Sequence, residues 1–228
     1  MVTLSTLPFF PSDARAQDQT RNEVWPEINA FYRFDAKYRL FLLFAPSFSE
    51  DDNYAESQVG AHIEMGILPI FRKQLSATHD IDRYRFLHFR VGIRHSWSLQ
   101  SSEALSEEWR GVVEATGRAS LPFDALASLR TRFDLRWVEG NYSTRYRTRL
   151  KFEKDTEIVS GYSIIPFASG EIFYDTRYKS WSRVQYQVGI TFPIIRMLAF
   201  EAYYSRQNNW FSQPARVNAV GLVAVLYF

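Results

Sequence analysis

The stretches LASLRTRFDLRWV (residues 126–138) and STRYRTRLKFE (residues 143–153) decide the fold. In each stretch, apolar and charged side chains alternate one by one. Successive side chains of a β-strand point to opposite faces, so each stretch predicts a strand with one apolar and one strongly charged face. The turn chemistry of Glu139-Gly140-Asn141 separates them, and we expect two adjacent antiparallel strands.

The same period of two extends over most of the chain, with turn residues between the segments. Tyr38–Phe48 is apolar on both faces, so its register is ambiguous. The pattern favours a single all-β domain, because no amphipathic helix of useful length interrupts it. The expected strands are Val24–Phe34, Tyr38–Phe48, Gln58–Ile67, Phe86–Trp97, Glu108–Ala119, Leu126–Val138, Ser143–Glu153, Ile164–Asp175, Arg183–Phe192, Met197–Gln207 and Arg216–Phe228.

The composition excludes several classes of protein. Aromatic residues make up 17% of the 228 residues, which is too rich for a disordered chain. Cys is absent, so there are no disulfides, thiolate metal sites or cysteine nucleophile. Arg supplies 22 of the 27 basic residues, yet the net charge is only +2, so no nucleic-acid partner is indicated. The sequence also indicates no cofactor and no metal site.

Two architectures bury one face of such strands. A soluble lipocalin-like carrier would place the apolar face inside, whereas an outer-membrane barrel places it in lipid and lines its interior with polar groups. The long segments, an Arg-, Glu- and Gln-rich polar face and aromatic residues near the ends of the apolar face favour the membrane barrel. Those aromatic residues are Trp97, Trp137, Tyr146 and Tyr204.

The predicted fold is therefore a single antiparallel up-and-down transmembrane β-barrel. Bacterial barrels of this kind usually have an even number of strands, whereas eleven segments are found. We expect about twelve strands, with the missing one inside Phe71–Arg83, and ten as the alternative.

The two ends of the chain point to export and membrane assembly. Residues 1–16 resemble a signal peptide, because Ala14 and Ala16 form an A-x-A cleavage pattern, and the barrel is expected over residues 17–228. The last strand ends in Tyr227 and Phe228, which resembles the signal read by the bacterial barrel-assembly machinery. The expected location is the bacterial outer membrane, with its lipid and lipopolysaccharide as partners.

Several short segments resemble an uncharacterised family of bacterial outer-membrane barrels, the domain of unknown function 2490. The resemblance covers most of the chain from Glu23 onward. It implies the location and the fold, and it brings no activity or catalytic residues. The matching segments are Trp25-Pro26-Glu27, Arg145-Tyr146-Arg147-Thr148-Arg149-Leu150, Pro166 with Glu171-Ile172-Phe173, Arg183 with Tyr186 and Gly189, Glu201 with Tyr203-Tyr204, and the terminal strand.

The polar face predicts the interior of the barrel and its function. More bases than acids are expected there, so the interior is either a structural plug of ion pairs or a narrow channel that favours small anions. Arg suits both roles, because its planar guanidinium pairs with carboxylates without losing its charge. The candidate lumen-lining and anion-binding residues are Arg90, Arg94, Arg130, Arg132, Arg136, Arg145, Arg147, Arg149, Arg183, Glu64, Glu171 and Glu201.

An enzyme acting on outer-leaflet lipid, of the phospholipase or lipid A deacylase type, is the alternative function. Such an enzyme needs a Ser, a His base and an orienting group close together. His95 and Ser96 are sequence neighbours, so on a strand they point to opposite faces and cannot form this pair. His62 and His88 are expected to face the interior, and no catalytic residue is assigned.

Overall fold

The computed structural model describes residues 20–49, 55–69, 85–99, 106–159 and 162–228. These residues form twelve β-strands, and each of the eleven expected segments is confirmed as a strand. Within the described ranges, no helix is long and apolar enough to cross a membrane. The strands are β1 (Thr20–Arg33), β2 (Tyr38–Phe48), β3 (Ala55–Pro69), β4 (Arg85–Leu99), β5 (Ser106–Leu121), β6 (Ala125–Val138), β7 (Asn141–Lys154), β8 (Thr156–Val159), β9 (Tyr162–Asp175), β10 (Ser180–Ile195), β11 (Leu198–Asn209) and β12 (Arg216–Tyr227).

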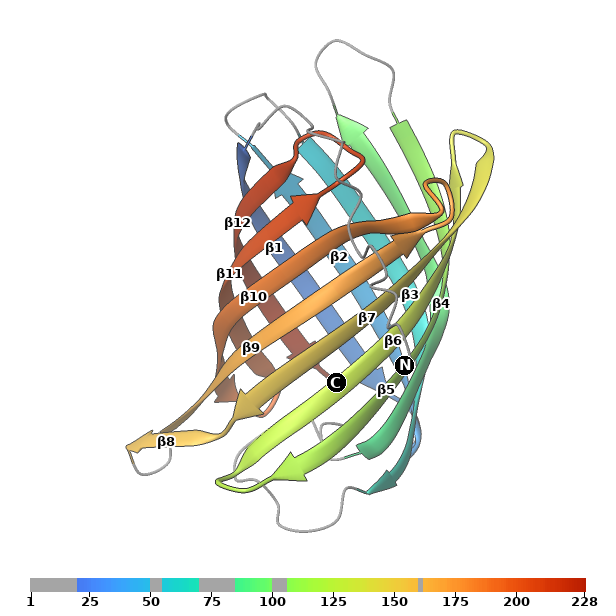
Figure 1. Ribbon diagram of the computed structural model, residues 1–228. Helices are drawn as coiled ribbons and strands as arrows, with labels where there is room; N and C mark the ends of the chain where they lie inside the picture. The colour runs from blue at the N-terminus through green and yellow to red at the C-terminus, as the bar shows by residue number, and fades with distance from the viewer. Residues whose placement is uncertain (1–19, 50–54, 70–84, 100–105, 160–161) are drawn as a thin grey trace, which may run out of the picture.

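Eleven of these strands close into a barrel (Figure 1). Neighbouring strands pair antiparallel from β1 to β7, then β7 with β9, and onward to β12. The strand β8 has four residues and pairs only with the lower end of β9, so it extends one hairpin beyond the wall. The prediction of an all-β barrel of about twelve strands is confirmed, with eleven strands in the wall itself.

The seam of the barrel differs from the expected up-and-down pattern. β1 and β12 pair in parallel, in register from Thr20 opposite Arg216 to Phe31 opposite Tyr227. An odd number of alternating strands can close only with one parallel pair, so no further strand is required in the wall. The range 71–83, where we expected a twelfth strand, lies outside the described residues.

The seam also sets the two ends of the barrel. The end that holds Thr20, Arg216 and the β9–β10 turn is drawn uppermost in Figure 1, and we call it the upper end. The β1–β2 turn and Phe228 lie at the lower end, where the backbone of Phe228 bonds with Phe31 and Arg33. The first described residue and the last residue therefore lie at opposite ends.

The polarity of the wall is inverted relative to a soluble barrel. Leu129, Phe133 and Val188 point outward and are 52%, 46% and 56% exposed. Arg132 and Asp134, on the same strand as Leu129 and Phe133, point inward and are 1% and 0% exposed. A soluble lipocalin-like barrel would bury the first group and expose the second. The charged face predicted from the sequence is the interior face of this barrel.

One close contact in the interior lies between β11 and β12. The ring of Tyr203 lies against Gly221, where an added Cβ would come within 2.0 Å of Tyr203 Cζ. Gly189 on β10 lies beside the Cβ atom of Tyr203, with 2.5 Å between an added Cβ and that atom. Gly221 therefore makes room for the ring of Tyr203, and Gly189 makes room for its Cβ atom.

We expect Gly221→Ala to lower the free energy of unfolding by about 1–3 kcal/mol, because the Tyr203 ring must leave its place. Gly117→Ala is the matched control, since an added Cβ there meets nothing within 4 Å. Urea unfolding in detergent micelles, followed by tryptophan fluorescence, measures both. Equal midpoints for the two variants would contradict this packing role.

Candidate anion site in the barrel interior

The barrel encloses a cavity of about 830 Å³. Side chains of all eleven wall strands line it, so it is the central space of the barrel. Of the twelve candidate residues predicted from the sequence, eleven line this cavity. The twelfth, Glu64, is buried beneath its arginine partners.

The strand register explains how the charges meet. Glu64, Arg90, Glu114 and Arg132 are direct partners across β3, β4, β5 and β6, and they form one row of alternating sign. The row continues to Arg147 on β7, so it ends in two adjacent arginines. In the next row Arg130 pairs with Arg149, and Arg149 pairs with Glu171. Opposite charges on neighbouring strands stabilise such a sheet, whereas the like-charged pairs need a shared anion.

Glu64 is the first shared carboxylate. It accepts short hydrogen bonds from Arg39 and Arg90, and His88 Nε2 lies 3.5 Å from Glu64 Oε2. Both arginines also stack on aromatic rings: Arg39 lies 4.1 Å from the Phe31 centroid and Arg90 lies 4.4 Å from that of Phe41. Buried charges need partners of this quality, so Glu64 is a structural centre of the barrel.

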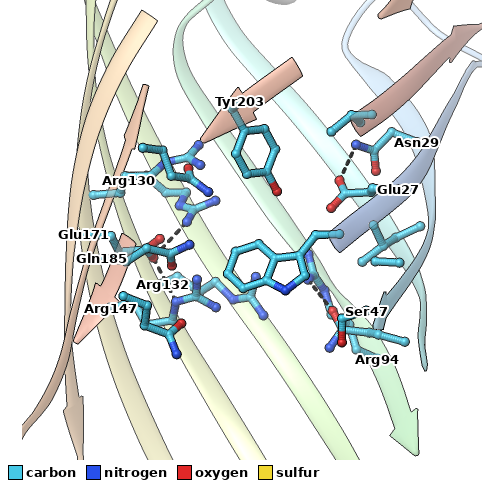
Figure 2. A pocket seen from close by; sticks show the side chains of 18 of the residues that line it. Glu27, Asn29, Ser47, Arg94, Arg130, Arg132, Arg147, Glu171, Gln185 and Tyr203 are labelled. Atoms are coloured by element: carbon cyan, nitrogen blue, oxygen red, sulfur yellow. Dashed lines mark hydrogen bonds and ion pairs between the residues drawn. The ribbon is translucent and has the colours of Figure 1, made fainter. Parts of the chain in front are cut away.

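Glu171 and Asp134 form the second group, of which Figure 2 shows Glu171 with Arg130 and Arg147. Arg130 and Arg147 both donate to Glu171 Oε1, at 2.8 Å each. Asp134 accepts from Arg132 Nε at 2.5 Å, and Arg147 Nη1 lies 3.7 Å from its other oxygen. One carboxylate thus serves two guanidinium groups in both cases.

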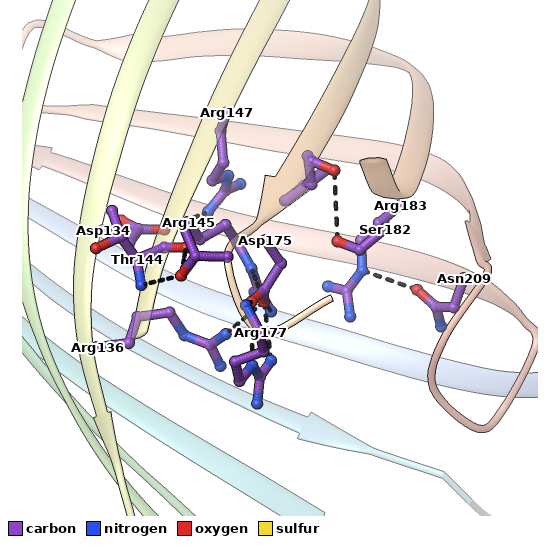
Figure 3. Close-up of polar contacts among 12 residues, drawn as sticks. Asp134, Arg136, Thr144, Arg145, Arg147, Asp175, Arg177, Ser182, Arg183 and Asn209 are labelled. Atoms are coloured by element: carbon purple, nitrogen blue, oxygen red, sulfur yellow. Dashed lines mark hydrogen bonds and ion pairs between the residues drawn. The ribbon is translucent and has the colours of Figure 1, made fainter. Parts of the chain in front are cut away.

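A third group lies at the upper end, around Asp175 (Figure 3). Arg136, Arg145 and Arg177 place nitrogens 3.0, 2.9 and 2.9 Å from Asp175 Oδ2. Arg136 also donates two hydrogen bonds to Glu108, at 2.5 and 2.7 Å. The hydrogen bond from its side chain to Asp175 raises the pKa of Arg177, a residue of the β9–β10 turn, above its usual value. This turn is therefore held to the mouth of the barrel by charge.

Three of the predicted arginines have no carboxylate at salt-bridge distance among the described residues. Arg94 donates to His62 Nε2 at 3.1 Å and to Gln58 Oε1 at 3.0 Å. Arg183 donates to Asn209 Oδ1 at 2.8 Å. Arg149 has no hydrogen-bond or ion-pair partner within the described ranges, because its neighbour Glu171 is occupied by Arg130 and Arg147. These three side chains can bind an anion without first breaking an ion pair.

The remaining candidates lie elsewhere in the molecule. Glu201 lines the cavity on β11, accepts a hydrogen bond from Thr191 at 2.9 Å and lies 3.9 Å from Lys151 Nζ. Tyr227 faces the interior and stacks on Phe31, with 5.4 Å between ring centroids. Phe228 is 60% exposed at the lower end.

Sequence reasoning did not assign Arg39, Glu108, Asp175 or Arg177 to the site. Arg39 was missed because its strand, β2, is apolar on both faces and buries Phe41 and Leu43 inside the barrel. Arg39 is the one charged residue of β2, so its position could have indicated which face of this strand points inward. Asp175 and Arg177 belong to the end of β9 and its turn, where the period of two stops.

The histidines within the described ranges do not gather with a serine. His62 and His88 are buried inside the barrel, as expected. His95 stacks on Trp109, an exposed residue of the outer face, whereas Ser96 is buried on the inner face. The described residues therefore offer no Ser–His pair for lipid hydrolysis.

We expect Glu64→Gln to lower the free energy of unfolding by about 3–5 kcal/mol, because two buried guanidinium groups lose their shared charge. Glu107→Gln is the matched control, since the side chain of Glu107 is 61% exposed; its effect should stay within about 0.5 kcal/mol. Urea unfolding in micelles measures both variants. A Glu64→Gln protein as stable as the control would contradict the structural role of this carboxylate.

Comparison with known proteins gives a family match. The model of the family described as "Protein of unknown function (DUF2490)" matches residues 22–218. Neither a curated protein nor a solved structure matches the chain. The matched range covers strands β1 to β11 and the start of β12, so it spans nearly all of the barrel. The chain belongs to the DUF2490 family.

Proposed function

We propose that this protein is an outer-membrane β-barrel with a narrow interior pathway that favours small anions. The observation that carries the proposal is the inverted polarity of the wall, with arginines in excess inside. Within the described ranges, fifteen Arg and Lys side chains and eight Glu side chains line the cavity. The buried Glu64, Asp134 and Asp175 add three carboxylates, so a positive surplus of four charges remains.

The outer surface supports placement in a membrane. Aliphatic and aromatic side chains that would be costly to expose to water cover it, among them Ile28, Val91, Ile93 and Leu222 at 46–58% exposure. The wall strands have 11 to 16 residues, which suits tilted spans of a bilayer. Near the upper end Trp181 packs against Tyr146 and Tyr174, with centroids 6.5 and 5.6 Å apart, as in an interfacial aromatic belt.

The closed wall also suits a lipid environment, because every strand of the ring is paired on both sides and no open edge is left. Export would require the segment 1–16 as a signal peptide, and this segment lies outside the described residues. Assembly would use the last strand, with Tyr227 and Phe228 as the signal for the barrel-assembly machinery. Outer-membrane lipid and lipopolysaccharide would then surround the barrel.

The anion preference follows from the unpaired arginines. A cation entering the cavity meets Arg94, Arg149 and Arg183, none of which has a carboxylate at salt-bridge distance among the described residues. An anion gains a charge-assisted hydrogen bond at each of them. The ion pairs around Glu64, Glu171 and Asp175 fix the wall, and they do not include these three arginines.

Membrane placement predicts the behaviour of the protein on extraction. We expect it to sediment with outer membranes, to require detergent for release and to migrate differently on gels before and after boiling, because the closed barrel resists unfolding. Fractionation followed by gel electrophoresis of unheated and heated samples measures this. Recovery in the aqueous fraction without detergent would contradict the proposal.

Anion preference predicts the sign of the reversal potential in planar bilayers under a KCl gradient. We expect chloride to permeate better than potassium, and Arg149→Gln with Arg183→Gln to reduce this ratio about threefold or more, because two uncompensated charges are removed. Arg206→Gln is the control, since Arg206 is exposed on the outer face of β11. Potassium selectivity of the wild type would contradict the proposal. Absence of conductance would also contradict an open pathway, and the interior ion pairs would then have a structural role only.

A further inference from the structure

We propose that the cavity binds a small zwitterion, a molecule that carries an ammonium group and a carboxylate or phosphate group. This inference rests on the proposed anion-favouring interior and names the class of solute. Its basis is that uncompensated charges of opposite sign face one another across the cavity.

The positive pole lies on β6 and β7, and Arg183 on β10 adjoins it. Arg149 and Arg183 line the cavity without a carboxylate at salt-bridge distance among the described residues. Arg132 adds a buried Nη2 atom that has no hydrogen-bond partner, although the residue is 1% exposed. Arg130 adds a buried Nε atom that likewise has no hydrogen-bond partner. Guanidinium donors of this wall are therefore left without an acceptor among the described residues.

The negative pole is Glu27 on β1. Its Oε1 atom accepts a hydrogen bond from Asn29 Nδ2 at 2.5 Å, and no Arg or Lys of the described chain lies at salt-bridge distance from it. Glu201 lies in the same row, because both Glu27 and Glu201 are register partners of Val223. The charge of Glu201 is only weakly compensated, because its one basic neighbour at salt-bridge distance among the described residues, Lys151, places Nζ 3.9 Å from Glu201 Oε2. Glu27 therefore has no ion-pair partner at salt-bridge distance among the described residues.

The two poles lie on opposite sides of the barrel. In the ring order, β1 is separated from β6 and β7 by half of the wall in either direction. Figure 2 shows Glu27 and Asn29 on one side of the cavity and Arg130, Arg147 and Glu171 on the other, with Tyr203 above the space between them. Glu27 and the arginines all line the one cavity of about 830 Å³.

A zwitterion satisfies both poles at once. Its anionic group would accept hydrogen bonds from Arg149 and its neighbours, and its ammonium group would donate to Glu27. A simple anion gains only the first contact and meets the repulsion of Glu27, whereas a simple cation gains only the second. The cavity volume suits a molecule of metabolite size.

The test compares three probes of similar size with the folded, detergent-solubilised protein: 6-aminohexanoate, hexanoate and hexylamine. Isothermal titration calorimetry measures the binding of each. We expect 6-aminohexanoate to bind about tenfold or more tightly than either singly charged probe, because one charge-assisted hydrogen bond is worth at least that factor. 4-Aminobutanoate is included as a shorter zwitterion.

Two variants locate the poles. Glu27→Gln should remove the advantage of 6-aminohexanoate over hexanoate, and Arg149→Gln should weaken the binding of both. Arg206→Gln, on the outer face, should change neither. Heat-modifiable migration on gels shows that each variant is folded.

The outcomes separate this inference from the proposed function. Equal binding of hexanoate and 6-aminohexanoate, binding of none of the probes, or a ratio that Glu27→Gln leaves unchanged would overturn the zwitterion site. Chloride selectivity in bilayers would still support the anion-favouring interior in each of these cases. Potassium selectivity would overturn the proposed function while the calorimetric comparison still decides the zwitterion site.

Discussion

The structure depends on closure of the sheet. A strand with an unpaired edge leaves a row of backbone donors and acceptors without partners, and in an apolar environment each of these is costly. Here β1 and β12 meet in a continuous parallel register of twelve residue pairs, so no wall strand has an open edge. Once the sheet is closed, the side chains of each strand point alternately outward and inward. The inward side chains are then confined to the narrow interior of the barrel. The dense charge contacts of the interior follow from that confinement.

The interior solves the problem of buried charge by sharing. Glu64, Glu171 and Asp175 each serve two or three guanidinium groups, which reduces the number of carboxylates needed to hold the wall. Arginine permits this, because its planar group presents five donors and also stacks on aromatic rings, as Arg39 does on Phe31. Other arginines of the interior, such as Arg149 and Arg183, have no carboxylate at salt-bridge distance among the described residues. The groups that stabilise the barrel and the groups available to a solute are therefore different members of one network.

The sequence predicted the strands well because alternation is a local signal. β6 and β7 alternate so clearly between apolar and charged residues that the sequence alone assigns both faces of each strand correctly. β2 did not, because Phe41 and Leu43 face inward, and only Arg39 marks the inner face. The parallel seam could not be predicted, since parity of strand number depends on pairing between the first and last strands, which no local pattern encodes. Likewise, the freedom of Arg149 depends on which neighbour occupies Glu171, a matter of side-chain competition across three strands.

The glycines around Tyr203 have a consequence for the shape of the space inside. Because Gly221 has no side chain, the ring of Tyr203 lies against the backbone of β12, and Gly189 leaves room for the Cβ atom of Tyr203 on the other side. The ring lines the cavity together with Glu27 and Glu201. In Figure 2 its hydroxyl group points toward the side of the cavity that holds Glu27. The place of this ring in the cavity lining thus depends on two neighbouring residues that contribute only backbone.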